Sequence, residues 1–343
     1  MNSSRLTPVT LMPGDGIGPE ITASLLQVFE ALGAPVQWEV VPLGLKAFET
    51  CGDALPPASL ESFRRTRLAL KGPVQTPLAS GFRSPLVRLR EEFHLFANLR
   101  PARTLMPGGL HENVSLTIVR ENTEGLYAAR EAYLPAGDDR EGIATALAWN
   151  SRAGCERILR FAFDHAIAHK RKKVTVVHKA NVLKILSGIF LNEARSLHTR
   201  EYSGRIDMEE MIVDACAMKM AMQPSHFDVI VTTNLFGDIL SDLAAGVTGG
   251  LGIAPGANIG KDAALFEAVH GSAPDIAGKG IANPVAMLLS GAMLLEHMGA
   301  AELASRLRQA INSAINEDQA RTADLGGTCS TETMTKAIVQ CLT

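Results

Sequence analysis

Short runs of apolar and β-branched residues alternate along the chain with longer stretches in which apolar residues recur every three or four positions. This alternation predicts β-α-β units with a largely parallel sheet, and so an α/β fold. The first strand is expected at 9–12, and the helix after it has Pro19 in its first turn and ends at Gly33. Further strands are expected at 36–41, 68–70, 116–119, 174–177 and 228–232. Further helices are expected at 61–66, 152–169 and 284–295 and around residues 238–242.

Composition narrows the class of protein. The 343 residues suffice for about two domains or one large α/β unit. Hydrophobic residues make up 46% and charged residues 20%, which is typical of an ordered globular chain and not of a disordered one. The net charge is −3, from 33 Lys and Arg against 36 Asp and Glu, which is too balanced for a general binder of nucleic acid or membrane surfaces. An acidic small molecule would need only a local cluster of cations.

The cysteines and the apolar stretches indicate the cellular compartment in which the protein is expected. The five cysteines are scattered and form no CxxC pair, so no disulfide framework or zinc knuckle is expected, and a reducing cytoplasm is the expected compartment. The first residues lack the apolar core of a signal peptide. The apolar stretch 284–295 is too short to span a bilayer and is expected to be a core helix. The glycine-rich stretch 249–260 is expected to be a hinge or crossing segment.

The first strand leads into a glycine-rich turn with glycines at 14, 16 and 18. Their spacing is GxGxG and not the GxGxxG of the dinucleotide-binding fingerprint, and no acidic residue follows clearly at the end of a second strand. A plain tight turn between a strand and a helix explains the motif equally well. A nicotinamide cofactor, if one binds, would therefore use another site.

Three arginines could bind carboxylates. Arg90 falls in a helical stretch, Arg100 precedes Pro101, and Arg120 ends an expected strand. Arginine pairs bidentately with carboxylates, so three arginines around one cavity would suit a di- or tricarboxylate. Each arginine alone is more often a surface or ion-pair residue, and the sequence does not show whether the three converge.

Other side chains could bind a metal or transfer protons. Asp238 and Asp242 are four apart in a helical segment, share one face and would fit Mg²⁺ or Mn²⁺, although such a pair is often only a solvated helix face. Asp214, after the run 211–213, could add a third carboxylate. Tyr127 and Lys179 are candidate proton-transfer groups, since cations or a metal can lower the pKa of either and burial can lower that of the lysine.

These pieces resemble the β-decarboxylating dehydrogenase family, which comprises the isocitrate, homoisocitrate and 3-isopropylmalate dehydrogenases. The matching motifs run in family order through nearly the whole chain: 14–20 (GDGIGPE), 120–127 (RENTEGLY), 178–181 (HKAN), 234–242 (NLFGDILSD) and 270–278 (HGSAPDIAG). So many long motifs in one order are hard to obtain by chance.

The resemblance implies an isopropylmalate-dehydrogenase-like fold, distinct from the Rossmann fold, with two interleaved α/β domains and a central cleft. Residues 1–95 with 249–343 would form the large, cofactor-binding domain, and 96–248 the small domain with substrate, metal and dimer-interface residues. The resemblance also implies a homodimer with shared active sites, or a higher oligomer. Lys179 and Asp214 would then reach into the partner's cleft and join Asp238 and Asp242 around the metal.

The resemblance carries roles to individual residues of this chain. Tyr127 and Lys179 match the acid/base pair. The carboxylates that would hold Mg²⁺ or Mn²⁺ are Asp214, Asp238 and Asp242. The substrate-binding positions are Lys71, Thr76, Ser84, Arg90, Arg100, Arg120 and Asn181. The positions that would bind NAD are Glu267, His270, Gly271, Ser272, Ala273, Asp275, Ile276 and Asn283.

The implied reaction is the NAD- and metal-dependent oxidative decarboxylation of isocitrate to 2-oxoglutarate. The stretch 71–77 looks like the isocitrate branch, because Lys71, Thr76 and Ser84 suit a γ-carboxylate. Leu86 stands where the isocitrate pattern commonly has Asn, which leaves homoisocitrate, another 3-substituted malate and, less favoured, 3-isopropylmalate open. A non-catalytic regulatory subunit is a further alternative. The expected partner is a 2-hydroxy di- or tricarboxylate, with neither nucleic acid nor membrane.

Overall fold

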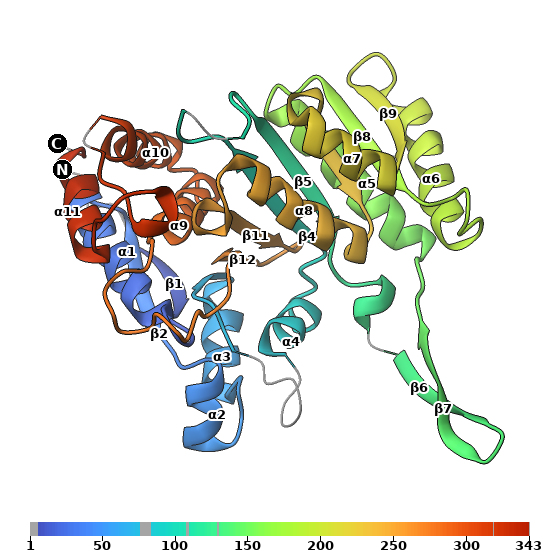
Figure 1. Ribbon diagram of the computed structural model, residues 1–343, viewed down its shortest axis with the longest axis horizontal. Helices are drawn as coiled ribbons and strands as arrows, with labels where there is room; N and C mark the ends of the chain where they lie inside the picture. The colour runs from blue at the N-terminus through green and yellow to red at the C-terminus, as the bar shows by residue number, and fades with distance from the viewer. Residues whose placement is uncertain (1–5, 76–83, 108–109, 129, 318, 343) are drawn as a thin grey trace. The chain divides into compact units, whose positions relative to one another are not determined.

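The computed structural model describes residues 6–75, 84–107, 110–128, 130–317 and 319–342. The chain divides into two compact units. Unit 1 comprises 1–95, 104–112 and 248–343, and unit 2 comprises 96–103 and 113–247. The sequence-based division grouped 104–112 with the central domain, whereas these residues belong to unit 1. Each unit contains a run of five hydrogen-bonded β-strands with helices packed beside them (Figure 1).

Unit 1 has strands in the order β2-β1-β3-β12-β11. All neighbouring pairs are parallel except β11 and β12, which are antiparallel. The strands are β1 (Thr7–Met12), β2 (Val36–Val40), β3 (Leu68–Lys71), β11 (Pro255–Ile259) and β12 (Ala264–Ala268). The helices are α1 (Gly18–Leu32), α2 (Leu45–Cys51), α3 (Pro57–Thr66), α4 (Pro85–Glu92), α9 (Val285–His297), α10 (Ala301–Asn316) and α11 (Thr331–Gln340). Short 3-10 turns are η4 (Leu251–Ile253) and η5 (Ala323–Leu325).

The glycine-rich turn after β1 holds several segments of unit 1 together. The Asp15 carboxylate accepts hydrogen bonds from the backbone N–H of Leu45 (2.8 Å) and of Gln75 (2.9 Å). Gly16 has φ of 58°, and a Cβ there would lie 1.9 Å from the carbonyl oxygen of Ser272. Glycine is required where the backbone is left-handed and crowded. The motif therefore acts as a tight turn that anchors neighbouring loops.

Unit 2 has strands in the order β4-β5-β10-β8-β9, with β4 antiparallel to β5 and the other pairs parallel. The strands are β4 (Ala97–Arg103), β5 (Ser115–Glu121), β8 (Lys173–His178), β9 (Asp207–Ile212) and β10 (Val229–Thr232). The helices are α5 (Arg152–Ala168), α6 (Leu186–Leu197), α7 (Val213–Met222) and α8 (Asn234–Thr248), with short turns η1 (Gly125–Ala128), η2 (His198–Tyr202) and η3 (Pro224–His226). The α/β class with a largely parallel sheet is thus confirmed.

The strand register of unit 2 places candidate functional residues at the carboxyl ends of neighbouring strands. Thr232 of β10 is paired with Arg120 of β5 on one side and with Val177 of β8 on the other. The carboxyl ends of these parallel strands therefore lie level, and the segments that follow them start side by side. Ligands of open α/β sheets bind at such carboxyl ends.

Two regions contain strands that were not expected. The stretch 249–260, expected to be a hinge or crossing segment, follows directly on the passage of the chain from unit 2 to unit 1 and contains η4 and the buried strand β11. A hairpin of β6 (Arg130–Ala136) and β7 (Asp139–Leu147) was not expected, and every residue of both strands is exposed. Figure 1 shows it projecting from unit 2.

Two findings concern covalent state and helix length. All five cysteines are free. None of the helices in the described parts of the chain combines the length and the apolar character needed to cross a bilayer.

Candidate active site

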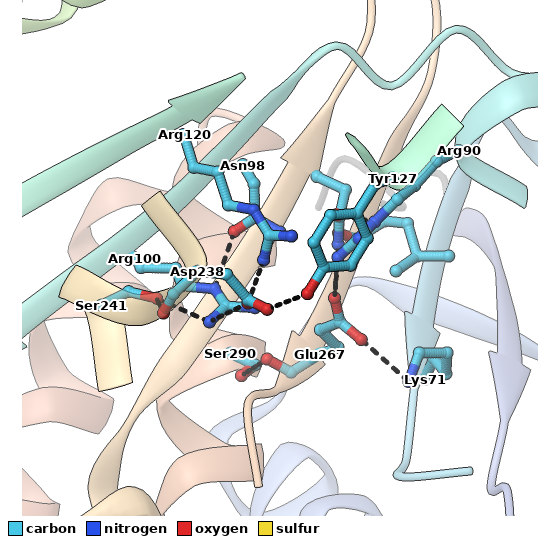
Figure 2. Close-up of polar contacts among 12 residues, drawn as sticks. Lys71, Arg90, Asn98, Arg100, Arg120, Tyr127, Asp238, Ser241, Glu267 and Ser290 are labelled. Atoms are coloured by element: carbon cyan, nitrogen blue, oxygen red, sulfur yellow. Dashed lines mark hydrogen bonds and ion pairs between the residues drawn. The ribbon is translucent and has the colours of Figure 1, made fainter. Parts of the chain in front are cut away.

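Arg120 is the centre of a polar cluster in unit 2 (Figure 2). Its side chain is only 1% exposed. The guanidinium donates from Nε (3.0 Å) and Nη2 (2.7 Å) to the side-chain oxygen of Asn234, and from Nη1 to Asp238. Gly237 makes this approach possible, since a Cβ there would lie 2.6 Å from Arg120 Cγ. The first turn of α8 therefore packs directly onto Arg120.

Arg100 joins the same cluster from β4. Its Nη1 donates to Ser241 Oγ (2.7 Å) and lies 3.3 Å from Asp242 and 3.5 Å from Asp238. Its Nε donates to the side-chain oxygen of Asn98 (3.2 Å). Two of the three expected arginines, Arg100 and Arg120, thus converge on the two aspartates of α8.

Tyr127 reaches this cluster from η1. Its hydroxyl donates to the second oxygen of Asp238, and the guanidinium carbon of Arg120 lies 4.9 Å from its ring centroid. Burial raises the pKa of Tyr127, and the hydrogen bond to Asp238 raises it further. In this arrangement the phenol holds its proton and could deliver it to a reacting atom.

The segment that presents Tyr127 is fixed by two glutamates. The Glu121 carboxylate accepts from the backbone N–H of Thr123 (2.9 Å) and of Glu124 (2.8 Å). The Glu124 carboxylate accepts from the backbone N–H (2.7 Å) and the hydroxyl (2.5 Å) of Ser151, which caps α5. The motif 120–127 is therefore a rigid connection between β5 and η1.

The oxygen donors of this cluster fit a hard divalent cation. Asp238 and Asp242 are one helical turn apart, and Asp242 has a side chain that is 58% exposed. Burial raises the pKa of Asp242, Arg100 opposes that rise, and the neighbouring Asp238 adds to it. Carboxylates held this close suit Mg²⁺ or Mn²⁺, which prefer oxygen ligands.

Lys179 and Asp214 form a separate pair in unit 2. Lys179 Nζ lies 2.8 Å from the Asp214 carboxylate, and this hydrogen bond lowers the pKa of Asp214. The Asp214 side chain is 69% exposed. Among the described residues no three His, Cys, Asp or Glu side chains are grouped as a metal site. The described residues of one chain therefore do not assemble Asp214 with Asp238 and Asp242.

The turn after β8 presents Lys179. The His178 ring accepts at Nδ1 from the backbone N–H of Ala180 (3.1 Å), and burial lowers its pKa, so the ring stays neutral. Asn181 is exposed in the same turn. His178 thus supports the backbone beside Lys179 and Asn181.

Unit 1 contains a second, buried cluster around Glu267 of β12. Lys71 lies 2.8 Å from one carboxylate oxygen, and Arg90 lies 3.6 Å from the other. Asn258 donates to Glu267 (2.7 Å) and accepts from Arg90 Nε (3.0 Å). Burial alone would raise the pKa of Glu267, but Lys71 and Arg90 outweigh it and hold the pKa at about 2.

This cluster revises the interpretation of Lys71. The sequence suggested that Lys71 contacts the substrate, whereas the residue is 2% exposed and its ammonium bonds Glu267 and the carbonyl of Gly72 (2.9 Å). Arg90 lies in unit 1 and bonds Asn258 and Glu267. Both cations therefore stabilise a buried carboxylate.

The other predicted substrate positions of unit 1 lie before and in α4. Ser84 is the residue before the helix, and the neighbouring Leu86 packs against the apolar core that contains Met12 and Phe63. Thr76 lies outside the described residues.

Apart from Glu267 in β12, the predicted cofactor positions lie between β12 and α9. The carbonyl of Ser272 accepts from the backbone N–H of Ile17 (2.9 Å), which ties this loop to the glycine-rich turn. Ala273 has φ of 39°, and its carbonyl accepts from the N–H of Ile276 (3.1 Å) in a tight turn. Gly271 and Asp275 are exposed on this loop.

Two side chains of the same segment are tied to the protein. His270 Nδ1 lies 3.0 Å from the carbonyl of Gly271, and burial lowers the pKa of the ring. The Asn283 amide donates to Asp324 (2.9 Å) and accepts from the N–H of Val285 (2.9 Å) at the start of α9. Asn283 thus has a structural role in addition to any contact with a cofactor.

Sequence reasoning missed the side-chain amides and the hydroxyl that hold the arginines. They are Asn98, Asn234, Ser241 and Asn258. Asn234 could have been found, because it lies two residues after an expected strand whose carboxyl end lies beside that of the Arg120 strand.

Comparison with known proteins agrees with this geometry. Residues 8–338 match the sequence pattern of the family described as isocitrate/isopropylmalate dehydrogenase. The chain is similar to the isocitrate dehydrogenase [NAD] catalytic subunit 5 of Arabidopsis thaliana, a mitochondrial protein, with 45% identity over 98% of this chain and 89% of that protein. It is similar to the isocitrate/homoisocitrate dehydrogenase of Thermus thermophilus, with 44% identity over 97% and 98%.

A solved structure extends the likeness to three dimensions. The isocitrate dehydrogenase of Methylococcus capsulatus is 50% identical, has a TM-score of 0.94, and is matched over 98% of this chain and 99% of that one. The predicted fold and the resemblance are thus confirmed. The chain belongs to the isocitrate/isopropylmalate dehydrogenase family.

Proposed function

We propose that the protein catalyses the NAD- and metal-dependent oxidative decarboxylation of isocitrate to 2-oxoglutarate. One observation carries the proposal: two arginines, two carboxylates and a phenol meet at the carboxyl ends of β5 and β10. The relatives named NAD isocitrate dehydrogenases support both the substrate and the cofactor.

The arginines supply substrate binding. Arg100 and Arg120 each offer several N–H groups, and both are held in place by neutral partners, Asn98 and Asn234. A guanidinium that is oriented in advance binds a carboxylate with less loss of conformational entropy. The cluster therefore suits a substrate with more than one carboxylate.

Lys179 and Tyr127 carry out the proton transfers. Asp238 and Asp242, with Asp214 of a second chain, would hold a divalent cation, which when bound would stabilise negative charge on the substrate, and bound NAD⁺ would take up the hydride. Lys179, directly or through water, accepts the α-hydroxyl proton as the carbonyl forms. After CO₂ leaves, Tyr127 donates a proton to the β-carbon of the enol, which gives 2-oxoglutarate. Isocitrate and NAD⁺ thus yield 2-oxoglutarate, CO₂ and NADH.

We also propose a homodimer in which each site draws on both chains. The pair Lys179–Asp214 is solvent-facing, and Asp238 and Asp242 are grouped elsewhere with the arginines. A partner chain could bring its own Lys179–Asp214 pair to the Asp238 cluster. A non-catalytic role is disfavoured because all of these groups are present.

Homoisocitrate is the second candidate substrate. Leu86 packs into the apolar core, so this position offers no polar group to a γ-carboxylate. A substrate with a longer β-substituent would rely less on a contact at this point. The Thermus thermophilus relative is named for both substrates.

Initial rates with a panel of substrates test the proposal. Isocitrate, homoisocitrate, 3-isopropylmalate, malate and tartrate should each be measured with NAD⁺ or NADP⁺ and with Mg²⁺ or Mn²⁺. The highest kcat/KM is expected for isocitrate with NAD⁺. A higher value for homoisocitrate would favour the second candidate, and no turnover of any 3-substituted malate would overturn both.

A further inference from the structure

Asn234 connects the arginine cluster to the segment that carries Tyr127. It is 1% exposed and begins α8. Its side-chain oxygen accepts two N–H groups of Arg120, at 3.0 and 2.7 Å. Its side-chain nitrogen donates to the backbone carbonyl of Glu124 at 3.0 Å. The oxygen of this amide thus binds Arg120, and its nitrogen binds the segment that leads to Tyr127.

The contacts of Asn234 close a ring. Glu124 directly precedes η1 and is three residues before Tyr127. Tyr127 donates to Asp238, and Asp238 accepts from Arg120, which returns to Asn234. Because Asn234 and Asp238 are four apart on α8, the helix sets the distance between the two ends of this ring.

The chemistry of the position requires an amide. Arg120 needs an acceptor, and the carbonyl of Glu124 needs a donor, so neither a carboxylate nor an apolar side chain serves both. Arg120 and Asn234 are each only 1% exposed, so a lost partner leaves a buried polar atom without a hydrogen bond. Gly125 reinforces the arrangement, because its N–H donates to the carbonyl of Trp149 (2.9 Å).

We propose that Asn234 is a positioning residue that orients Arg120 for substrate binding through its oxygen and Tyr127 for proton donation through its nitrogen. This inference rests on the proposed function, in which Arg120 binds a carboxylate and Tyr127 protonates the enol. It assigns to one side chain the coupling of these two tasks.

The variant Asn234→Asp separates the role of the side-chain oxygen from that of the side-chain nitrogen. The variant keeps the acceptor for Arg120 and the size of the side chain, but it sets a carboxylate oxygen against the Glu124 carbonyl. Loss of the hydrogen bond from Asn234 to the Glu124 carbonyl predicts that solvent exchange of the β-proton of 2-oxoglutarate slows by about tenfold or more. Reduction of oxalosuccinate by NADH at saturating substrate should stay within about threefold, because it does not need the Tyr127 proton at carbon.

The variant Asn234→Ala removes both the oxygen acceptor and the nitrogen donor. Here the proton exchange should fall and the KM for isocitrate should also rise by about tenfold or more, because Arg120 loses its acceptor. This variant also serves if Asn234→Asp does not fold. Asn316→Asp is the matched control, since Asn316 likewise donates to a backbone carbonyl, that of Leu105 (2.8 Å), but in unit 1. It should leave both partial reactions unchanged.

A readout without turnover completes the test. Trp149 fluorescence, measured in a Trp38→Phe background, reports on the segment that Gly125 ties to Trp149. Acrylamide quenching of Trp149 should increase in Asn234→Asp and not in Asn316→Asp. Thermal unfolding of each variant shows that the measurements are made on folded protein.

The outcomes separate the inference from the proposed function. Equal slowing of exchange and reduction in Asn234→Asp, or no slowing of either with unchanged quenching, would overturn the positioning role. If the unmodified protein catalyses no proton exchange, or if Tyr127→Phe exchanges at the normal rate, the assignment of Tyr127 in the proposed function is wrong instead.

Discussion

At the scale of single residues, the buried pair Lys71–Glu267 makes the clearest prediction about stability. Lys71→Met leaves the buried Glu267 carboxylate with Arg90 and the Asn258 amide but without its nearest cation. Breaking a buried ion pair by removing one partner costs about 3–5 kcal/mol. Urea unfolding at pH 7 should show a loss of this size in the free energy of unfolding.

The exposed pair Lys336–Glu332 provides the control. Both side chains are largely exposed, at 68% and 72%, and the two charged atoms lie 2.6 Å apart. Lys336→Met should leave the free energy of unfolding nearly unchanged, as is usual for surface pairs. Equal losses for the two variants would contradict the burial argument for Lys71.

The loss caused by Lys71→Met should depend on pH. The pKa of Glu267 is about 2 in the folded protein against an ordinary value of 4.5, so its contribution to stability is present above about pH 4.5 and is lost as the pH falls towards 2. Without Lys71, burial raises the pKa of Glu267, and protonation relieves the buried charge at a higher pH. The difference between the variant and the unmodified protein should therefore shrink below about pH 4.5. A difference that grows on acidification would contradict this assignment.

Asp275 predicts the choice of cofactor. It is exposed on the loop after β12, where the family resemblance places the adenosine ribose. A carboxylate that faces a 2′-phosphate loses hydrogen bonds and adds repulsion, and two effects of about 1.4 kcal/mol each give roughly 100-fold discrimination. The ratio of kcat/KM for NAD⁺ over NADP⁺ should be of this order, and Asp275→Lys with Ile276→Tyr should shift it towards NADP⁺. Equal or better use of NADP⁺ by the unmodified protein would refute this interpretation of the loop.

Candidate functional residues could be predicted from the sequence, but the residues that they bond to could not. Arg120, Tyr127 and Asp238 stand in long motifs, and the family likeness identifies them as candidates. Lys71 stands in a motif as well, but its partner Glu267 is almost two hundred positions away, and only the pairing of β3 with β12 brings them together. A contact across such a distance in sequence leaves no local pattern.

At the scale of elements, strands with continuous apolar runs were predictable, and the exposed hairpin was not. Strand β10 is buried throughout, whereas every residue of β6 and β7 is exposed. The glycines of 249–260 suggested a hinge or crossing segment, and the buried strand β11 within this stretch was not expected. Gly256 lies in this buried strand, where a Cβ would come within 3.2 Å of Val269. Glycine marks close packing at this position and not mobility.

The hairpin of β6 and β7 predicts an interface with a second chain. Leu134 is paired with Ile143, and Leu147 lies on the same face, with 48%, 46% and 64% of their surfaces exposed. A two-stranded hairpin without a covered face is only marginally stable in water. The double variant Leu134→Asp and Ile143→Asp should shift the protein from dimer towards monomer in sedimentation velocity. Val40→Asp, at an exposed apolar residue of unit 1, should not, and a monomeric unmodified protein would contradict the proposal.

At the scale of the whole molecule, shared active sites predict complementation between inactive variants. Homodimers of Lys179→Met and of Asp238→Asn should each be nearly inactive. In a mixed dimer, one site would carry both changes and the other neither. Random exchange of subunits gives half mixed dimers, so about a quarter of the unmodified activity should return.

The control for complementation mixes Asp238→Asn with Asp242→Asn. Both aspartates lie on α8 of one chain, so every site of that mixture carries a change and activity should not return. Proven exchange without recovery in the Lys179→Met mixture would show that each site is built from one chain.

The stoichiometry of the reaction tests the central claim most directly. With purified protein, Mg²⁺ and limiting isocitrate, NADH can be followed by absorbance while CO₂ and 2-oxoglutarate are quantified in the same sample. The account predicts one NADH, one CO₂ and one 2-oxoglutarate for each isocitrate consumed, and nearly no product from Asp238→Asn in the same time. NADH without CO₂, or no turnover of isocitrate by protein shown to be folded and dimeric, would contradict it.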